Sequence, residues 1–382
     1  MDTERLQQAI ADAGREGRRL EIRGGGSKRA IGAPRDDAAI LDTSACRGIL
    51  AYDPAELVVT VGAGTPLVEL EQLLADNGQM LAFEPFDHGP IFGHGTGSAT
   101  IGGVIAAGVS GSRRLSAGAA RDHLLGFRAI SGRGEAFVGG AKVVKNVTGY
   151  DLPKVMAGSW GRLALLTELS LKVLPSPRAR ANLMLEGLTD AEAIGTLSRA
   201  LGGDCDIAAA AHFPQGTARD EAVTLMRLEG FGPSVEARLA ALAQDYGGAV
   251  VRGEEELALW EKLKTLEPLA DGALLWRIVV PPSLGWRVPK GLDGFARRWL
   301  YDWGGGLIWL TAPDPEAPVR RVAESVGGHA MLVRAAPDVR TVIDTFHPET
   351  PAVAALSRRV AAGFDPTGVF ASGRFAGGAD AH

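Results

Sequence analysis

Cysteine, long apolar runs and surplus positive charge are all scarce in this 382-residue chain. Its two cysteines, Cys46 and Cys205, lie far apart, so we expect no disulfide framework or metal knuckle and a reducing, cytoplasmic environment. The most apolar glycine-rich run, 101–109, is too short for a membrane span, which needs about 20 residues. The amino terminus lacks the cationic start and apolar stretch of a signal peptide. The chain has a net charge of −5 and no basic stripe, so its charge does not favour binding to nucleic acids.

The length of the chain predicts two or three domains. The proline pair at Pro175 and Pro177 marks the clearest boundary, so we expect domains at 1–175 and 176–345, with 346–382 as a C-terminal segment that returns to the first domain. The spacing of His, Cys, Asp and Glu matches no metal-ligand pattern, and no metal site is predicted.

The first domain is predicted to mix short strands with helices. Strands are expected at 20–23, 39–41, 57–61, 124–130, 135–138 and 163–174, because these stretches are apolar, alternating or rich in β-branched residues. Helices are expected at 3–16, at 104–109, and after Thr65-Pro66, where the Thr65 hydroxyl is predicted to cap the helix. Asp151 is expected to cap a short helix that ends at Gly158.

Beyond the prolines, helices and strands alternate. Helices are predicted at 189–201, 234–246, 254–265 and 315–325, and strands at 223–229, 275–280, 306–311 and 329–334. This pattern predicts an α+β domain with helices on one face of a mixed or antiparallel sheet, and it suggests a duplicated half. A last helix is expected at 350–362.

Three successive glycines follow the first strand, in the run Arg23-Gly24-Gly25-Gly26-Ser27-Lys28. Such a loop presents backbone N–H groups without Cβ hindrance and can bind a diphosphate, with Arg23 or Lys28 adding charge. The spacing matches neither a Walker loop nor the Rossmann fingerprint. On its own, the loop is more simply explained as a plain hairpin or loop turn.

A second glycine segment, 93–103, enters another helix and is expected to present further exposed amides. Two glycine nests within one domain favour a long ligand lying across it, and a dinucleotide has that length. A third stretch, Lys142-Val143-Val144-Lys145-Asn146-Val147-Thr148-Gly149-Tyr150-Asp151-Leu152, is followed by Gly158-Ser159-Trp160-Gly161. The closing motif is Phe364-Asp365-Pro366-Thr367-Gly368-Val369-Phe370.

In this order the motifs resemble those of the vanillyl-alcohol oxidase / p-cresol methylhydroxylase flavoprotein superfamily, over residues 20–175 and 360–375. Within it the chain is most similar to the FAD-binding E subunits of bacterial glycolate oxidase (glycolate dehydrogenase). The resemblance implies a two-subdomain FAD-binding domain and a smaller α+β cap. It also implies a larger homologous flavin subunit and an iron–sulfur subunit as partners, and a small 2-hydroxy acid as substrate. The chain would then be cytoplasmic and reach the inner membrane only through partners.

The resemblance also implies which residues hold FAD: Arg23, Gly24, Gly25, Gly26, Ser27, Lys28, Pro85, Gly97, Thr100, Gly102, Gly103, Ala106, Gly111, Gly161, Leu166 and Arg374. The first loop lacks the histidine that some relatives link covalently to the flavin. His88 and His94 lie near the second loop, but their context matches no linking motif. We therefore expect FAD to be bound noncovalently.

Oxidising a 2-hydroxy acid requires a base for the hydroxyl proton and a cation for the carboxylate. His329 and Arg334 are the leading candidate pair, and Arg277 is a further carboxylate partner. A structural histidine at a strand start, and an arginine paired within the sheet, are the alternatives. Because this set is thin, three functions stay open: a subunit of a glycolate oxidase complex, a self-sufficient dehydrogenase, and a flavin-binding scaffold without turnover of its own.

Four tryptophans of the second domain have no assigned role: Trp286, Trp299, Trp303 and Trp309. Because tryptophan is enriched at interface hot spots, we expect them to anchor a subunit interface. Packing in the protein core is the alternative.

Overall fold

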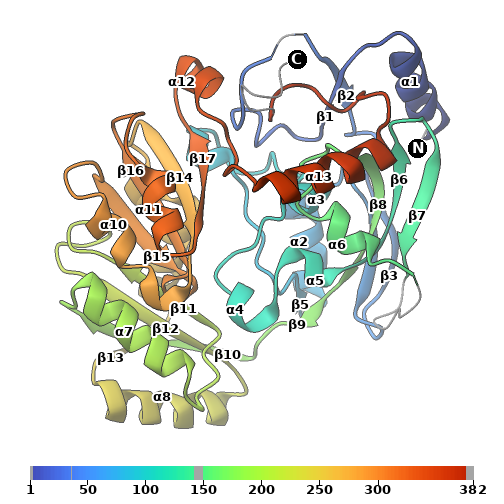
Figure 1. Ribbon diagram of the computed structural model, residues 1–382. Coiled ribbons are helices and arrows are strands. Elements are labelled where there is room, and N and C mark those ends of the chain that lie inside the picture. The colour runs from blue at the N-terminus through green and yellow to red at the C-terminus, as the bar shows by residue number, and fades with distance from the viewer. Residues whose placement is uncertain (1–2, 36, 142–148, 376–382) are drawn as a thin grey trace.

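The computed structural model describes residues 3–35, 37–141 and 149–375, and it shows two lobes, each built on its own β-sheet (Figure 1). Residues 142–148, which carry much of the third motif, lie outside the described residues. The α+β class is confirmed. The division at 175 and 345 stays a prediction.

The first lobe combines a parallel pair, β1-β2, with a five-stranded antiparallel sheet of order β3-β4-β8-β6-β7. Its elements are α1 (Thr3–Arg15), β1 (Leu20–Arg23), β2 (Ala39–Asp42), β3 (Ile49–Asp53), β4 (Val58–Gly62), α2 (Leu67–Asp76), β5 (Gln79–Met80), η1 (Gly89–Phe92), α3 (Ile101–Ala107), α4 (Arg114–Ala117), α5 (Ala120–His123), β6 (Leu124–Ser131), β7 (Ala136–Gly140), α6 (Leu152–Met156), β8 (Ala164–Lys172) and β9 (Leu174–Pro175). β8 lies at the centre of the larger sheet, and its Leu169 and Leu171 are fully buried, as expected for an apolar strand covered on both faces.

The second lobe is an eight-stranded sheet of order β13-β10-β12-β11-β15-β16-β14-β17. Its elements are β10 (Ala179–Glu186), α7 (Asp190–Leu201), β11 (Ala209–Phe213), β12 (Val223–Gly230), α8 (Gly232–Tyr246), β13 (Ala249–Val251), α9 (Glu254–Thr265), η2 (Glu267–Leu269), β14 (Leu274–Val279), η3 (Pro282–Leu284), α10 (Arg287–Gly291), β15 (Arg298–Asp302), η4 (Trp303–Gly305), β16 (Leu307–Ala312), α11 (Val319–Ser325) and β17 (His329–Arg334). Every pairing in this sheet is antiparallel, so the antiparallel alternative is right and the mixed one is wrong.

The expected duplication is present in the topology of the second lobe. β10 to β13 and β14 to β17 each run strand–helix–strand–strand–helix–strand, and the halves meet where His212 of β11 pairs with Tyr301 of β15. One face of the sheet packs against α7, α8, α10 and α11. The other face, which carries Leu275 and Trp309, shares a hydrophobic core with the first lobe. Residues on this inner face are therefore candidates for a site between the lobes.

The C-terminal segment crosses back to the first lobe through α12 (Pro337–Val342) and α13 (Pro351–Phe364) (Figure 1). Asp365 then turns the chain, because its buried carboxylate accepts hydrogen bonds from the amides of Val369 at 2.9 Å and Phe370 at 2.7 Å. Val369 and Phe370 pack with Ile10 of α1 in a small separate core. This turn explains the Phe-Asp-Pro-Thr-Gly-Val-Phe motif physically.

Several sequence expectations need correction. The Thr65 hydroxyl does not cap α2: Pro66 occupies the N-cap position, and the Thr65 oxygen accepts a hydrogen bond from the Gly48 amide instead. α3 begins at Ile101 rather than 104, because Thr100 caps it. Six strands had no sequence prediction: β3, β5, β10, β11, β13 and β15.

We predict that Asp365→Ala lowers the free energy of unfolding by about 2 kcal/mol, since two buried amides lose their acceptor. Urea unfolding of the purified chain measures this change. Asp220→Ala, at an exposed carboxylate, is the matched control and is expected to leave stability unchanged. Equal stability of the two variants would contradict the assigned role of Asp365.

Candidate functional site

Several amides of the first glycine loop donate no hydrogen bond to any residue that the structure describes. The turn closes with hydrogen bonds from the Arg29 amide to the Gly26 carbonyl and from the Ile31 amide to the Lys28 carbonyl, both at 3.0 Å. Within the described part of the chain, no hydrogen bond is donated by the amides of Gly25, Gly26 or Ser27. Gly26 has φ +78°, which suits glycine. The loop therefore offers free donors to an anion.

The second glycine segment lies directly against the first. A Cβ on Gly25 would lie 1.6 Å from the Ser98 carbonyl oxygen, and one on Gly24 would lie 2.4 Å from the Thr100 hydroxyl. Neither position tolerates a side chain. Gly24 and Gly25 thus allow the close approach of the second segment, whereas Gly26 provides the positive φ of the turn.

Most amides of the second segment are already hydrogen-bonded within the chain and so are not free for a ligand, which corrects the sequence expectation. The carboxylate of Asp87 accepts hydrogen bonds from the amides of Gly89, Gly97, Ser98 and Ala99, at 2.8–3.0 Å. At the start of α3, the Ile101 and Gly102 amides donate to carbonyl oxygens of Thr65 and Ala63, at 2.9 and 2.8 Å. The Gly103 amide donates to the Thr100 hydroxyl at 3.3 Å. Gly97 is therefore committed to Asp87.

Most of the predicted cofactor residues line one cavity of the first lobe. Its lining comprises Glu21, Ile22, Arg23, Gly24, Gly25, Gly26, Ser27, Lys28, Arg29, Thr43, Ala63, Thr100, Gly102, Gly103, Ala106, Ala107, Trp160, Gly161, Ala164, Leu166, Arg374 and Phe375. We call this the glycine-loop cavity. Of the predicted set, only Pro85, Gly97 and Gly111 do not line it; Pro85 and Gly111 line a second cavity described below.

Arg374, from the C-terminal segment, stabilises the glycine loop through hydrogen bonds and an ion pair. Its guanidinium donates to the carbonyl oxygens of Ile31 at 2.6 Å and of Lys28, and it forms an ion pair with Glu21 at 3.2 Å. Glu21 also pairs with Arg23 at 3.0 Å. Because Arg374 is tied in this way, it holds the shape of the loop while still lining the cavity.

Lys28 and His88 are ionisable residues in and close to the glycine loop, and burial lowers the pKa of both. Burial lowers the pKa of Lys28 to about 8, although the Asp87 carboxylate acts in the opposite direction. His88 is buried, its ring stacks on Phe86 at 4.8 Å, and its Nδ1 has no hydrogen-bond partner in the described chain. Burial first, and then the charges of Lys28 and Arg277, hold the pKa of His88 well below its usual range. At neutral pH its imidazole is therefore uncharged.

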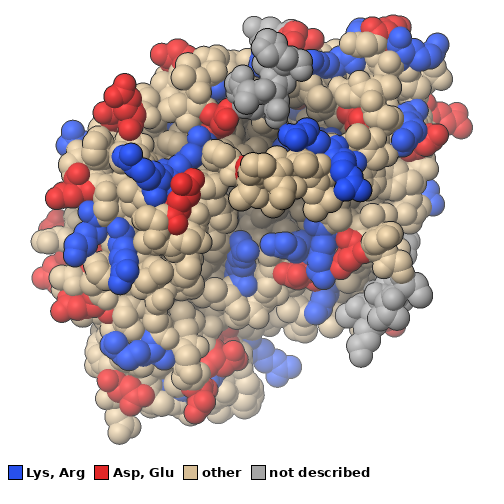
Figure 2. Space-filling view, viewed as in Figure 1, with Lys and Arg blue, Asp and Glu red and all other residues tan. Residues whose placement is uncertain are grey.

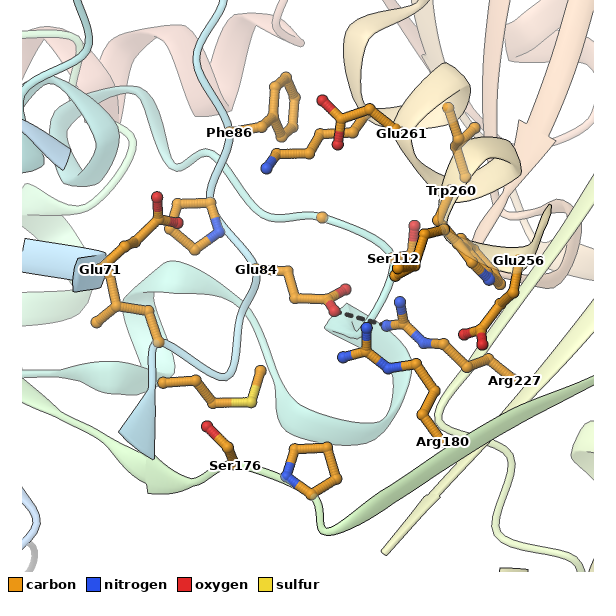
Figure 3. Close-up of a pocket in the computed structure, with 18 of the residues that line it drawn as sticks. Glu71, Glu84, Phe86, Ser112, Ser176, Arg180, Arg227, Glu256, Trp260 and Glu261 are labelled. Carbon is orange, nitrogen blue, oxygen red and sulfur yellow. Dashed lines mark hydrogen bonds and ion pairs between the residues drawn. The ribbon is translucent and has the colours of Figure 1, made fainter. Parts of the chain in front are cut away.

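A second cavity of about 680 Å³ lies between the lobes, and we call it the inter-lobe cavity. Figure 2 shows the surface hollowed between the lobes, with Lys and Arg side chains gathered there. In the close-up, Glu84 of the first lobe meets Arg227 of the second, at 2.7 Å, beneath Trp260 of α9 (Figure 3). Arg227 also pairs with Glu229 at 3.1 Å. This buried network joins the lobes across the cavity floor.

Asp302 lines the same cavity at the end of β15. Its carboxylate accepts hydrogen bonds from the Ser112 hydroxyl at 2.9 Å and the Trp303 amide at 2.7 Å. Burial raises the pKa of Asp302 to about 7. A carboxyl group with such a pKa exchanges a proton near neutral pH.

The structure brings together two of the three predicted catalytic residues. β14 and β17 are neighbours, and Val279 pairs with His329 and Arg277 with Met331, so Arg277 and His329 lie on the inner face of the sheet. Burial and then Arg277 lower the pKa of His329. The ring of His347 lies 6.3 Å from that of His329.

Arg334 has other partners. Its guanidinium donates to the carbonyl oxygens of Ile91 and Leu269 at 2.6 Å and of Gly272 at 2.8 Å. These bonds tie β17 to η1 of the first lobe and occupy its donors, so the structure does not pair Arg334 with His329.

The four tryptophans of the second lobe differ in burial, which bears on whether they belong to the core or to a subunit interface. Trp303 and Trp309 are buried inside the chain, so they are not on an exposed subunit interface. Trp299 and Trp286 are partly exposed, and the Trp299 indole donates to Asp190 at 2.7 Å.

Sequence reasoning missed Asp87, Asp302 and the Glu84–Arg227 pair. Asp87 carries a usable signal, since a lone acidic residue close before a glycine run can serve as acceptor for that run's amides. The others are brought together only by the tertiary fold.

Comparisons with known proteins agree with this geometry. Residues 1–140 match a family described as an FAD binding domain. The chain is similar to glycolate oxidase subunit GlcE of Escherichia coli, at 36% identity over 97% of this chain and 95% of that protein. It is also 35% identical to a D-lactate dehydrogenase of Anaerostipes hadrus, over 37% of this chain and 28% of that one. Among solved structures, an alkyldihydroxyacetonephosphate synthase matches 95% of the chain and 74% of its own, with a TM-score of 0.68 at 16% identity, which shows the fold alone.

The fold and the matched segment place the chain among FAD-linked oxidoreductases with an FAD-binding domain of the p-cresol methylhydroxylase type, as the sequence predicted. Within that class, the chain belongs to the glycolate oxidase subunit GlcE family. No helix in the described ranges is long and apolar enough to cross a bilayer.

The residues of the glycine-loop cavity fit FAD chemically. Free amides and the cations Arg23 and Lys28 suit a pyrophosphate, and glycines leave room for its approach. Ile22, Ala106 and Leu166 supply an apolar wall.

Lys28 predicts how FAD affinity depends on pH. Protonated Lys28 attracts the pyrophosphate, so affinity is expected to fall, by up to about tenfold per pH unit, as the pH rises above about 8. The flavin-free chain follows the opposite trend: its depressed Lys28 pKa makes stability rise over that range. Flavin fluorescence titrations from pH 7 to 9.5 measure the affinity. Lys28→Gln is expected to bind more weakly below pH 8 and to show no such slope; a slope equal to that of the unmodified chain would refute this role.

Proposed function

We propose that the chain is the FAD-binding oxidoreductase subunit of a glycolate (2-hydroxy acid) oxidase complex, passing electrons from substrate through the flavin to an iron–sulfur partner. The observation that carries the proposal is the match to glycolate oxidase subunit GlcE over nearly the whole length of both chains. The free amides of the glycine loop support it independently, because they give a flavin dinucleotide its anion site.

The pyrophosphate of FAD would be held by the amides of Gly25, Gly26 and Ser27, with Lys28 neutralising charge. Noncovalent binding is supported by the cavity lining, since no His, Cys or Tyr is among the described residues that form it. Pro85 and Gly111 lie toward the inter-lobe cavity and would face the flavin ring. When bound, FAD supplies the acceptor for the electrons of a C–H bond.

The remaining chemistry would come from the inner face of the second lobe. His329 is exposed and its lowered pKa keeps the imidazole neutral at pH 7, as a base requires. Arg277 is positioned to hold a carboxylate. Asp302 is buried and already hydrogen-bonded, so we assign it to holding the lobes rather than to substrate.

The partners proposed are a homologous larger flavin subunit and an iron–sulfur subunit, through which the complex would reach the inner membrane from the cytoplasm. Glycolate oxidase subunit GlcD of Bacillus subtilis is 29% identical to this chain over 163 residues, so two such subunits can share one FAD-binding architecture. A self-sufficient dehydrogenase and a scaffold without turnover are the competing functions.

Purified chain is expected to be yellow, and acid precipitation is expected to release the flavin into the supernatant. Gly25→Ala is expected to abolish binding, because its Cβ would lie 1.6 Å from the Ser98 carbonyl oxygen. Gly363→Ala is the matched control, because Gly363, like Gly25, has no positive φ and a Cβ there would meet open space; this variant is expected to bind FAD normally. Colourless protein that cannot be reconstituted with FAD would overturn the proposal.

Dye reduction with glycolate separates the three functions. The proposed subunit is expected to turn over only with its partners, and His329→Ala is expected to lower that turnover at least about tenfold. Turnover by the isolated chain favours the self-sufficient dehydrogenase. Full activity of a complex carrying His329→Ala favours the scaffold.

A further inference from the structure

Two arginines from different lobes lie against one tryptophan ring. The guanidinium carbon of Arg114, at the start of α4, lies 4.3 Å from the centre of the Trp303 ring, and that of Arg277, on β14, lies 5.2 Å from it. Trp303 is fixed between the lobes, because its indole N–H donates to the Gly111 carbonyl at 3.0 Å. The ring therefore holds both cations at the lobe boundary.

Neither guanidinium has an acidic partner. Within the described ranges, the side chains of Arg114 and Arg277 form no hydrogen bond and no ion pair, whereas Arg227 and Arg180 nearby are paired with Glu84 and Glu229. Burial, and then the charge of Arg114, lowers the pKa of Arg277 to about 10. A half-buried cation without a counter-ion is unfavourable unless a ligand supplies the charge.

The surrounding groups do not neutralise the pair. Asp302 is the acid that acts on Arg277, but its carboxylate is engaged by Ser112 and the Trp303 amide. Asp122 is the acid that acts on Arg114; it forms no ion pair with it in the described ranges, and its carboxylate accepts a hydrogen bond from the Ala119 amide at 2.9 Å. His88 and His329 face Arg277 as well, and they are neutral or add positive charge. A cation–π contact leaves the N–H edges of a guanidinium free to donate.

We propose that Arg114 and Arg277, held against Trp303, form a binding site for the carboxylate of a small organic acid between the lobes. Identifying this acid as a 2-hydroxy acid rests on the function proposed above; its negative charge rests on the unpaired arginines alone. His329 lies on the neighbouring strand and is itself exposed to solvent. A bound carboxylate would contact both lobes and tie them together.

Oxalate is a suitable probe, since it is a two-carbon acid without an oxidisable C–H bond. FAD-loaded chain, and separately flavin-free chain, would be titrated with sodium oxalate by calorimetry at constant ionic strength. We expect one site per chain, and Arg277→Gln or Arg114→Gln is expected to weaken binding at least about tenfold, as loss of a charge-assisted hydrogen bond implies. Arg277→Lys is expected to retain most of the affinity.

The chain offers a matched control at Trp286, where Arg287 lies 5.5 Å from the ring in another cation–π contact. Arg287→Gln is expected to leave oxalate binding unchanged. Should Arg277→Gln fail to fold, Arg114→Gln carries the test from the other lobe.

Two results would overturn the site. One is the absence of oxalate binding by the FAD-loaded chain; the other is equal affinity in Arg114→Gln, Arg277→Gln and the unmodified protein. Variants that lose FAD but keep oxalate binding would assign the arginines to the cofactor instead. If the chain binds FAD but not oxalate, the site is refuted and the proposed function stands. If the chain binds no FAD, the proposed function is refuted, and the site is judged by oxalate binding to the flavin-free chain.

Discussion

The candidate site depends on the hydrogen bonds that the carboxylate of Asp87 accepts. It gathers four backbone amides from 89 and 97–99 and so fixes the second glycine segment. That segment in turn packs against the first glycine loop, with the Ser98 backbone at Gly25 and the Thr100 side chain at Gly24. Hydrogen bonds to a charged acceptor contribute about 1.5–3 kcal/mol each, more than neutral ones. The Asp87 carboxylate thus orders the second glycine segment. The first glycine loop, in contrast, would offer its free amides to a ligand.

The lobes are joined by polar contacts that enclose a shared space. Glu84 meets Arg227, Ser112 meets Asp302, and Arg334 reaches the Ile91 carbonyl. Each contact pairs a residue of the first lobe with one of the second, close to the inner face that carries Arg277 and His329. A ligand extending from the glycine loop past Lys28 and His88 would therefore end where the unpaired arginines lie. In the proposed function, the cofactor and the substrate would bind at neighbouring places on the boundary between the lobes.

The sequence predicted the parts of this arrangement that local chemistry controls. The apolar strand β8 and the first glycine loop each carry a pattern whose physical meaning is local. β11 was missed because its Ala-Ala-Ala run has low strand propensity, and its pairing with β12 and β15 decides its structure. The role of Asp87 was missed because three of the amides that donate to it, those of 97–99, lie ten to twelve residues further along the chain. Arg334 was misjudged because its carbonyl partners, which come from two segments distant in the sequence, leave no pattern there.

The most direct test of this account is the affinity of the Asp87→Ala variant for FAD, measured by quenching of flavin fluorescence. Loss of the carboxylate leaves four amides without an acceptor and releases the segment that supports the glycine loop. The account predicts FAD binding at least about tenfold weaker than in the unmodified chain, with partial recovery in Asp87→Asn. Unchanged affinity in Asp87→Ala would contradict it.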